Sequence, residues 1–142
     1  MPKVQLCQAP AAQRMPQSPR LTAHHPEESL MNAHEVPDLD PQPRDADGHG
    51  YVDFMASDKL SAGLAIWPRG VTDRQTPHHE DEVYYVIGGR ATIRVANEER
   101  AVAAGSLVFV GAGVEHRFHD IEEELRVLVF WAPPHGGPPG AR

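Results

Sequence analysis

Residues 70–89 read GVTDRQTPHHEDEVYYVIGG, and this stretch decides the fold that we expect for the chain. The run Val83–Ile87 is rich in β-branched and aromatic residues, which favour strands, and Gly88-Gly89 closes it. A second run of the same kind, residues 91–95, follows at once. The two runs are therefore predicted to form a β-hairpin.

Two histidines and one glutamate, His78, Glu82 and His116, lie on or beside predicted strands. Because side chains alternate across a strand, Glu82 shares a face with Tyr84, and His116 shares a face with Phe118. A polar group surrounded by apolar side chains needs a partner, and three such groups that converge need a cation. The pattern predicts one buried metal site.

The rest of the chain contains further short strand patterns separated by Gly, Pro and charged turns, one of them an acidic turn at residues 120–124. Leu125–Trp131 is apolar on both faces apart from one arginine, so we expect it in the centre of a sheet. Seven or eight such strands at short intervals predict an all-β antiparallel sandwich or barrel. The other predicted strands are Tyr51–Met55 at an edge, Leu60–Trp67, residues 106–110 and residues 116–119.

The chain has 142 residues and 14 prolines, most of them in residues 1–50. This head shows no sustained period of 2 or 3.6 residues, so it is predicted to be a mostly disordered, Pro-rich extension. Residues 51–134 are predicted to form one β-domain, and residues 135–142 a flexible Gly/Pro tail.

The composition excludes several classes of function. The net charge of -7, with scattered arginines, argues against a nucleic-acid partner. No apolar run is long enough for a signal peptide or a membrane span. Since Cys7 is the only cysteine, no disulfide can form within the chain, and we expect a protein of the reducing cytoplasm.

Two spaced motifs frame the predicted ligands. In the first, Gly70 is followed after five residues by Thr76-Pro77-His78, after three more by Glu82, and after six more by Gly89. In the second, five residues separate Gly105 from Gly111-Ala112-Gly113, two more precede His116, and three more precede Asp120. With both motifs in register, the chain resembles the cupin superfamily of small jelly-roll barrels, or double-stranded β-helices, over roughly residues 60–132.

The resemblance implies a divalent metal ion (Fe, Mn, Ni or Zn) bound by His78, Glu82 and His116. Thr76 stands where the family usually has its first histidine, so one of four ligands is missing. His79, Gln75 or a water is a candidate to fill that position. Two imidazoles and one carboxylate resemble the ligand set of non-haem iron dioxygenases, which leaves positions open for substrate.

The alternatives stay open at this point. A metal-dependent isomerase, cyclase or lyase fits the same ligands, and so does a non-catalytic cupin that binds or senses a small ligand. If the metal has been lost, Glu82 is expected to pair with Arg94 or Arg117. The predicted pocket residues are Gln75, Thr76, Tyr84 and Phe118, whereas Trp67 and Trp131 are interpreted as packing. We also expect a homodimer formed through the edge strand at residues 51–55.

Overall fold

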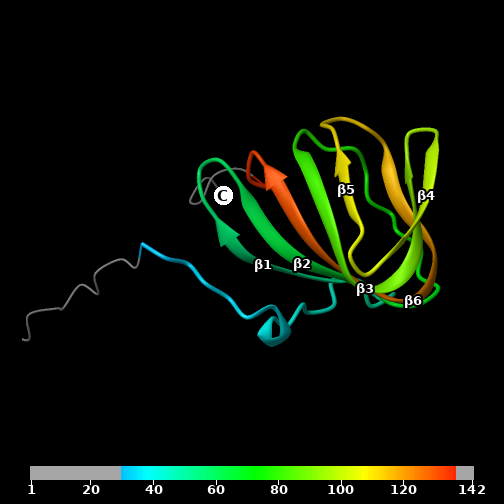
Figure 1. The fold of residues 1–142 in the computed structure, drawn as a ribbon, viewed down its shortest axis with the longest axis horizontal. Helices are drawn as coiled ribbons and strands as arrows, with labels where there is room; N and C mark the ends of the chain where they lie inside the picture. The colour runs from blue at the N-terminus through cyan, green and yellow to red at the C-terminus, as the bar shows by residue number, and fades with distance from the viewer. Residues whose placement is uncertain (1–29, 137–142) are drawn as a thin grey trace, which may run out of the picture. The chain divides into compact units, whose positions relative to one another are not determined.

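The computed structural model describes residues 30–136 of the chain. It contains one short 3-10 helix, η1, and six β-strands, all paired antiparallel (Figure 1). No helix in this part of the chain is long and apolar enough to cross a membrane. The prediction of an all-β antiparallel fold is confirmed. The elements are η1 (Val36–Asp38), β1 (Gly50–Ala56), β2 (Ser61–Trp67), β3 (Asp81–Val95), β4 (Glu98–Ala103), β5 (Leu107–Val110) and β6 (His116–Ala132).

The strands follow the order β1-β2-β6-β3-β4, and β5 pairs with β3. β1 lies at one edge, as predicted for residues 51–55. The second half of β6 lies between β2 and β3, so the apolar run Leu125–Trp131 is central, as predicted. Since a central strand is covered on both faces, apolar residues on both faces are what this position requires.

The predicted hairpin at Gly88-Gly89 is wrong, and so is the predicted acidic turn at residues 120–124. β3 and β6 each continue through these positions as one long strand. Their pairing shifts register between Val86 and Thr92, which marks bulges rather than a chain reversal. Both strands therefore bend together, round the lower side of the barrel in Figure 1.

The bend divides each long strand into two halves that pair with different strands. The first half of β3 pairs with β5 and with the second half of β6, whereas the second half of β3 pairs with β4 and with the first half of β6. At the corner, Gly89 has φ +86°, and Asp120 on β6 has φ +48°. A Cβ at Gly89 would overlap the carbonyl oxygen of Glu124, so only glycine lets the strands approach this closely.

The inward faces of these strands form the core. Glu82, Tyr84 and Val86 are almost fully buried, whereas Tyr85 is 40% exposed, so the predicted alternation of faces is confirmed. On β6, His116 and Phe118 point inward in the same way. The buried apolar side chains come from all six strands, and the polar Glu82 and His116 lie among them.

Part of the predicted N-terminal extension contacts the barrel. Pro43 forms an isolated β-bridge with Gly50, and the backbone N–H of Arg44 donates to the carbonyl of His49. The imidazole of His49 stacks on Trp67 at a centroid distance of 4.9 Å. Residues 43–49 are thus part of the barrel wall. Residues 1–29 and 137–142, to which most of the predicted extension and tail belong, lie outside the described residues.

We expect Gly89→Ala to destabilise the protein by about 3 kcal/mol, since it combines a left-handed backbone with an overlap against Glu124. Its neighbour supplies the control, because a Cβ at Gly88 would meet Arg126 at an ordinary 3.8 Å. Gly88→Ala should change the free energy of unfolding by less than about 1 kcal/mol. Urea unfolding of both variants measures this, and equal stabilities would contradict the role given to Gly89.

Candidate metal centre

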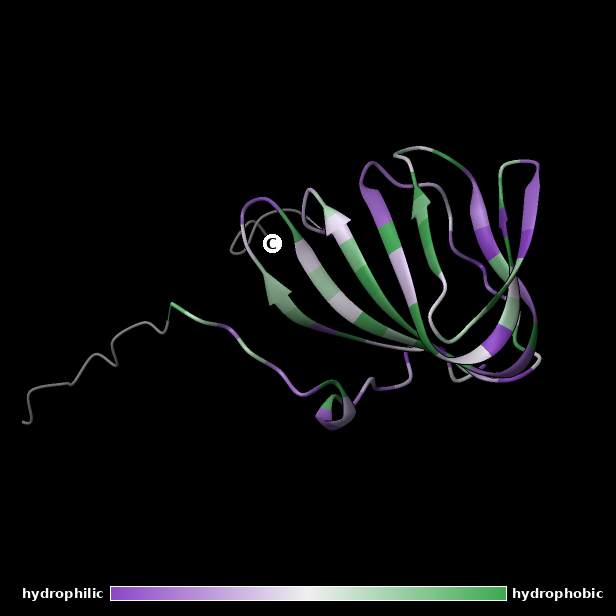
Figure 2. Cartoon of the chain, in the orientation of Figure 1, coloured by the Kyte–Doolittle hydropathy of each residue, from purple (hydrophilic) through white to green (hydrophobic). Residues whose placement is uncertain are grey.

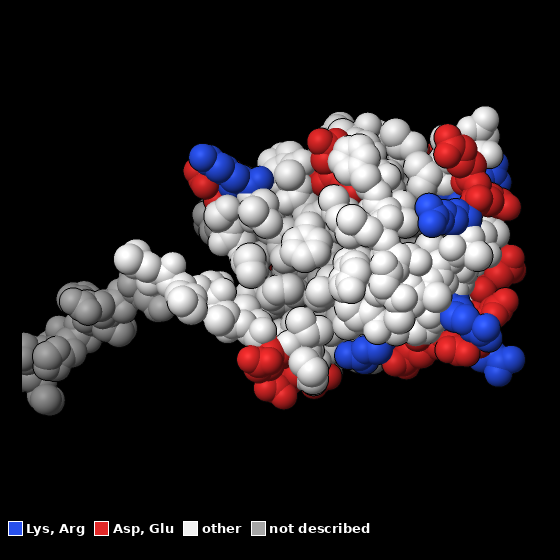
Figure 3. Space-filling model, viewed as in Figure 1, with Lys and Arg blue, Asp and Glu red and all other residues white. Residues whose placement is uncertain are grey.

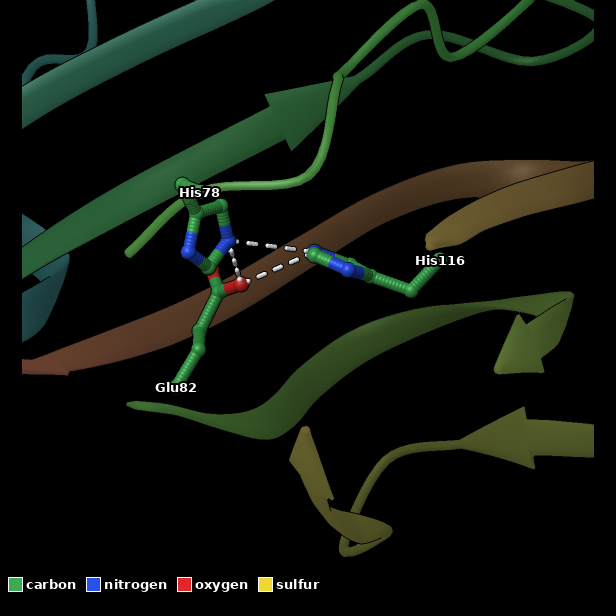
Figure 4. A group of neighbouring side chains, drawn as sticks. All are labelled: His78, Glu82 and His116. Atoms are coloured by element: carbon green, nitrogen blue, oxygen red, sulfur yellow. Dashed lines mark hydrogen bonds and ion pairs between the residues drawn. The ribbon is translucent and has the colours of Figure 1, made fainter. Parts of the chain in front are cut away.

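Three elements bring the predicted ligands together. His78 lies on the loop before β3, and its carbonyl accepts a hydrogen bond of 2.7 Å from the backbone N–H of Gly113. Glu82 is the second residue of β3, and His116 is the first residue of β6. Figure 4 shows the three side chains pointing toward one another. The predicted convergence is therefore observed.

The three side chains meet through one atom each. Oε2 of Glu82 lies 2.9 Å from Nε2 of His78 and 3.0 Å from Nε2 of His116, and the two nitrogens lie 3.3 Å apart (Figure 4). Among the described residues they form the one group of three or more His, Cys, Asp or Glu side chains spaced to hold a metal ion.

The other nitrogen of each imidazole fixes its protonation. Nδ1 of His78 lies 3.1 Å from the carbonyl oxygen of Glu80, and Nδ1 of His116 lies 2.7 Å from that of Val114. A carbonyl oxygen only accepts, so each Nδ1 carries a proton and donates it. In the neutral rings both Nε2 atoms then present lone pairs to each other and to Glu82, which is the arrangement of metal-binding histidines.

The residues fit a divalent ion. Ligand atoms about 2.1 Å from one ion lie roughly 3.0 to 3.4 Å apart for angles between a right angle and a tetrahedral angle. The three observed separations of 2.9, 3.0 and 3.3 Å lie close to that range. In addition, Oε1 of Glu82 is buried and has no hydrogen-bond partner within residues 30–136. A buried carboxylate oxygen without a donor is costly, and a cation beside it would remove that cost.

The surroundings of the group also shift the pKa values of two side chains, one in the group and one beside it. Burial lowers the pKa of His116, but the hydrogen bonds to Glu82 and to the Val114 carbonyl outweigh it, so the pKa is raised above its ordinary value. Burial and the charge of Glu82 raise the pKa of Tyr84 well above its usual range. Tyr84 therefore keeps its proton and acts as a hydrogen-bond donor beside the site.

The residues predicted to line a pocket differ in whether they reach the cavity beside the candidate ligands. Gln75 and Thr76 lie at the cavity that His78 and Glu82 line, and so does Tyr84, as predicted. The Gln75 amide is already engaged, since its Oε1 accepts from Tyr84 and its Nε2 donates to Asp73. Phe118 does not line this cavity; it packs between Trp67 and Tyr84.

Two alternatives for the ligands are not supported. His79 is exposed and is not part of the group formed by His78, Glu82 and His116. The expected pairing of Glu82 with Arg94 or Arg117 is wrong, because Glu82 contacts the two imidazoles and Arg94 donates instead to the carbonyl of Ala96.

The cavity has a volume of about 400 Å³ and opens beside the candidate ligands. Trp67 and Trp131, interpreted from the sequence as packing residues, contribute to its wall. So does His135 from the predicted tail; its ring stacks on Trp131 and its backbone N–H donates to Ser61. The aromatic wall was missed because these residues lie far apart in the sequence and on different elements.

Asp73 is a further residue that the sequence did not reveal. It is buried, and its carboxylate accepts hydrogen bonds from the backbone N–H groups of Phe118 and Gln75 and from the Gln75 amide. Burial raises the pKa of Asp73, although these hydrogen bonds act in the opposite direction. Because Phe118 follows His116 by two residues, Asp73 ties the loop before His78 to the strand that carries His116.

An antiparallel β-barrel with two imidazoles and a carboxylate converging inside it defines the class of small barrels with a candidate metal site. The chain belongs to the cupin family: residues 64–132 match the family described as Cupin domain. An uncharacterized protein of Streptomyces coelicolor is 46% identical over 104 residues, which cover 73% of this chain and 98% of that protein.

Solved structures show the same fold. TT1209 from Thermus thermophilus is similar with a TM-score of 0.64 and 24% identity, covering 73% of this chain and 99% of that chain. The DMSP lyase DddQ from Ruegeria pomeroyi is similar with a TM-score of 0.56 and 20% identity, covering 71% of this chain and 51% of that chain. At these identities the likeness concerns the fold alone.

We expect Asp73→Ala to lower the free energy of unfolding by about 2 kcal/mol, because it leaves the buried Phe118 N–H without an acceptor. For a domain of this size, that loss lowers Tm by roughly 10 °C. Asp73→Asn keeps one acceptor oxygen and should lose less. Thr72→Ala, at an exposed neighbour, is the control. A Tm for Asp73→Ala equal to that of the control, measured by calorimetry, would refute this role.

Proposed function

We propose that this cupin binds a divalent metal ion through His78, Glu82 and His116 and acts as a metal-dependent enzyme on a small organic substrate. The supporting observation is that His78 and Glu82 themselves line the 400 Å³ cavity, so an ion between them would face the space that a substrate enters. We also propose a cytoplasmic location, which rests on the single cysteine of the sequence.

The donor set is compatible with several metals, and the metal decides the chemistry. Iron in a site of two histidines and one carboxylate supports dioxygenation, whereas Mn, Ni or Zn supports Lewis-acid chemistry of the isomerase, cyclase or lyase type. A dioxygenase is our first candidate, since three protein ligands of this kind leave positions open. The fold shared with a DMSP lyase makes lyase chemistry the second candidate.

The chain's own residues would order the substrate. The Tyr84 hydroxyl donates to Oε1 of Gln75, and Gln75 donates to Asp73, so both pocket residues are held in fixed orientations. Their position beside Glu82 suits a role in orienting a polar group of the substrate. The aromatic wall would exclude water from the apolar part of the substrate.

A non-catalytic cupin that binds or senses a small ligand is the alternative. Thr76 occupies the place of the first family ligand, and Gln75 is turned to Asp73 and Tyr84, so no fourth side chain completes the group within residues 30–136. Such a protein would use the cavity without turnover. A protein that lacks metal, or that binds metal without oxygen uptake or product formation across catechol-like and keto-acid substrates, would favour this alternative.

Protein purified without chelator should contain about one divalent ion per chain, and His116→Ala should lose it, because two remaining ligands bind such an ion weakly. Elemental analysis by mass spectrometry measures the content and identifies the metal. His119→Ala is the matched control: it lies on the same strand, but its ring pairs with Asp120 and Glu99 outside the site. Equal metal content in the two variants would refute the proposed site.

We further propose a homodimer whose interface is formed by β5 and not by the expected edge strand β1. On the outer face, Leu107 and Phe109 of β5 are 66% and 64% exposed, and Tyr85 beside them is 40% exposed. Figure 2 shows β5 as hydrophobic, and Figure 3 shows that charged residues gather mainly toward the rim of the face in view. An exposed apolar patch of this kind favours association. It supports contact through β5 rather than β1.

Light scattering should therefore give the mass of two 15.6 kDa chains. The double variant Leu107→Glu, Phe109→Glu should give one chain, since it places charges on the apolar patch. Circular dichroism serves as the control for folding. A monomeric wild-type protein would contradict the homodimer, and a dimeric double variant would contradict the choice of β5.

A further inference from the structure

The cavity beside the candidate ligands has two arginines at its wall, and only one of them is paired. Nη2 of Arg74 lies 3.6 Å from Oδ2 of Asp47, so its charge is matched. Arg44 instead lies over the ring of Tyr51, with Cζ 4.3 Å from the centroid. Within residues 30–136, no carboxylate oxygen lies within 4.0 Å of the Arg44 guanidinium. Its charge is thus available to a ligand.

The acidic side chains of the cavity wall are already engaged. Asp45 accepts hydrogen bonds from the backbone N–H groups of Asp47 and His49. Asp73 accepts from Phe118 and Gln75, and Glu82 faces the two imidazoles of the candidate metal centre. None of the three is directed to Arg44. The cavity therefore contains one cation that pairs with none of the carboxylates of its wall.

The backbone and ring around Arg44 hold it in place. Its N–H donates to the His49 carbonyl at 2.6 Å, inside the loop closed by the bridge from Pro43 to Gly50. The Tyr51 ring beneath it is fixed too, since its hydroxyl donates to Asp53 and accepts from Nε1 of Trp131. A guanidinium held over an aromatic ring presents a planar fork of N–H donors that matches a carboxylate.

The space beyond Arg44 suits a flat apolar group. Trp67, Tyr84 and Trp131 line it, and the imidazoles of His49 and His135 stack on the two tryptophans. A volume of about 400 Å³ is enough for a small organic molecule and too small for a polymer segment of several residues.

We propose that the ligand of this cavity is a small organic acid with a planar body. Its carboxylate pairs with Arg44, its body lies along the tryptophans, and its far end reaches the group formed by His78, Glu82 and His116. This inference deepens the proposed function by naming a substrate class. Only the contact of the ligand's far end with the candidate metal centre rests on the proposed function. The contact between the carboxylate and Arg44 needs no metal.

The test titrates two probes of equal shape, benzoate and uncharged benzamide, into the full chain. The only two tryptophans of the sequence, Trp67 and Trp131, both line the cavity, so their fluorescence reports its occupancy directly. Benzoate should change the fluorescence saturably and bind about tenfold or more tightly than benzamide, because only benzoate makes charge-assisted hydrogen bonds to Arg44. Equal affinity for the two probes would overturn the proposal.

The variants Arg44→Gln and Arg74→Gln separate the two arginines. Arg44→Gln should weaken benzoate binding about tenfold or more and leave benzamide binding unchanged. Arg74→Gln should alter benzoate binding less than about twofold, since Arg74, exposed like Arg44, is already paired with Asp47. Absence of saturable benzoate binding, or equal losses in the two variants, would overturn the assignment of Arg44.

Each titration is run on metal-free protein and on protein loaded with Zn²⁺. If benzoate binding depends on Arg44 in both the metal-free and the Zn²⁺-loaded protein, the inference is supported, whether or not the metal raises the affinity for benzoate. If the chain binds no divalent ion, in elemental analysis or on loading with Zn²⁺, but benzoate binding still depends on Arg44, the proposed enzyme fails and the organic-acid site stands. If Zn²⁺ binds but Arg44→Gln leaves the affinity for benzoate unchanged, the metal site stands and this inference fails.

Discussion

Two imidazole nitrogens and one carboxylate oxygen lie about 3 Å apart inside an apolar barrel, each with a lone pair directed at the others. That contact is the constraint on which the structure of the site depends. In the neutral rings the only N–H groups are at Nδ1, and they donate to the carbonyls of Glu80 and Val114. The three atoms can stay together only when a positive charge, either a metal ion or an added proton, lies among them.

The fold supplies this contact through the bend of its two long strands. Glu82 lies in the half of β3 that pairs with β5, whereas His116 pairs with Val95 in the other half of β3. The two residues therefore lie on opposite sides of the bend, and the turning of β3 and β6 at the bulges around Gly89 brings them toward one another. Gly89, which lets the strands approach closely at the bend, thus helps to set the relative positions of two of the ligands.

The features that the sequence could predict are those that follow from a regular spacing of residues. Alternation along Val83–Ile87 fixes which residues point inward, and the spacing of the two motifs identifies His78, Glu82 and His116. The bend could not be predicted, because Gly88-Gly89 has the same local signature in a hairpin and in a bulged long strand. Arg44 lies in a stretch without periodicity, where only contacts made after folding determine which side chains reach the cavity.

The loop before β3 explains how this site can differ from one with four protein ligands. Asp73 accepts hydrogen bonds from both Phe118 and Gln75, so the same carboxylate fixes the strand of His116 and draws the Gln75 amide away from the candidate centre. Thr76, at the position of the usual first ligand, is exposed at the cavity. The side of the centre left without a protein ligand therefore faces the cavity, which is where a small molecule has to arrive if it is to contact the ion.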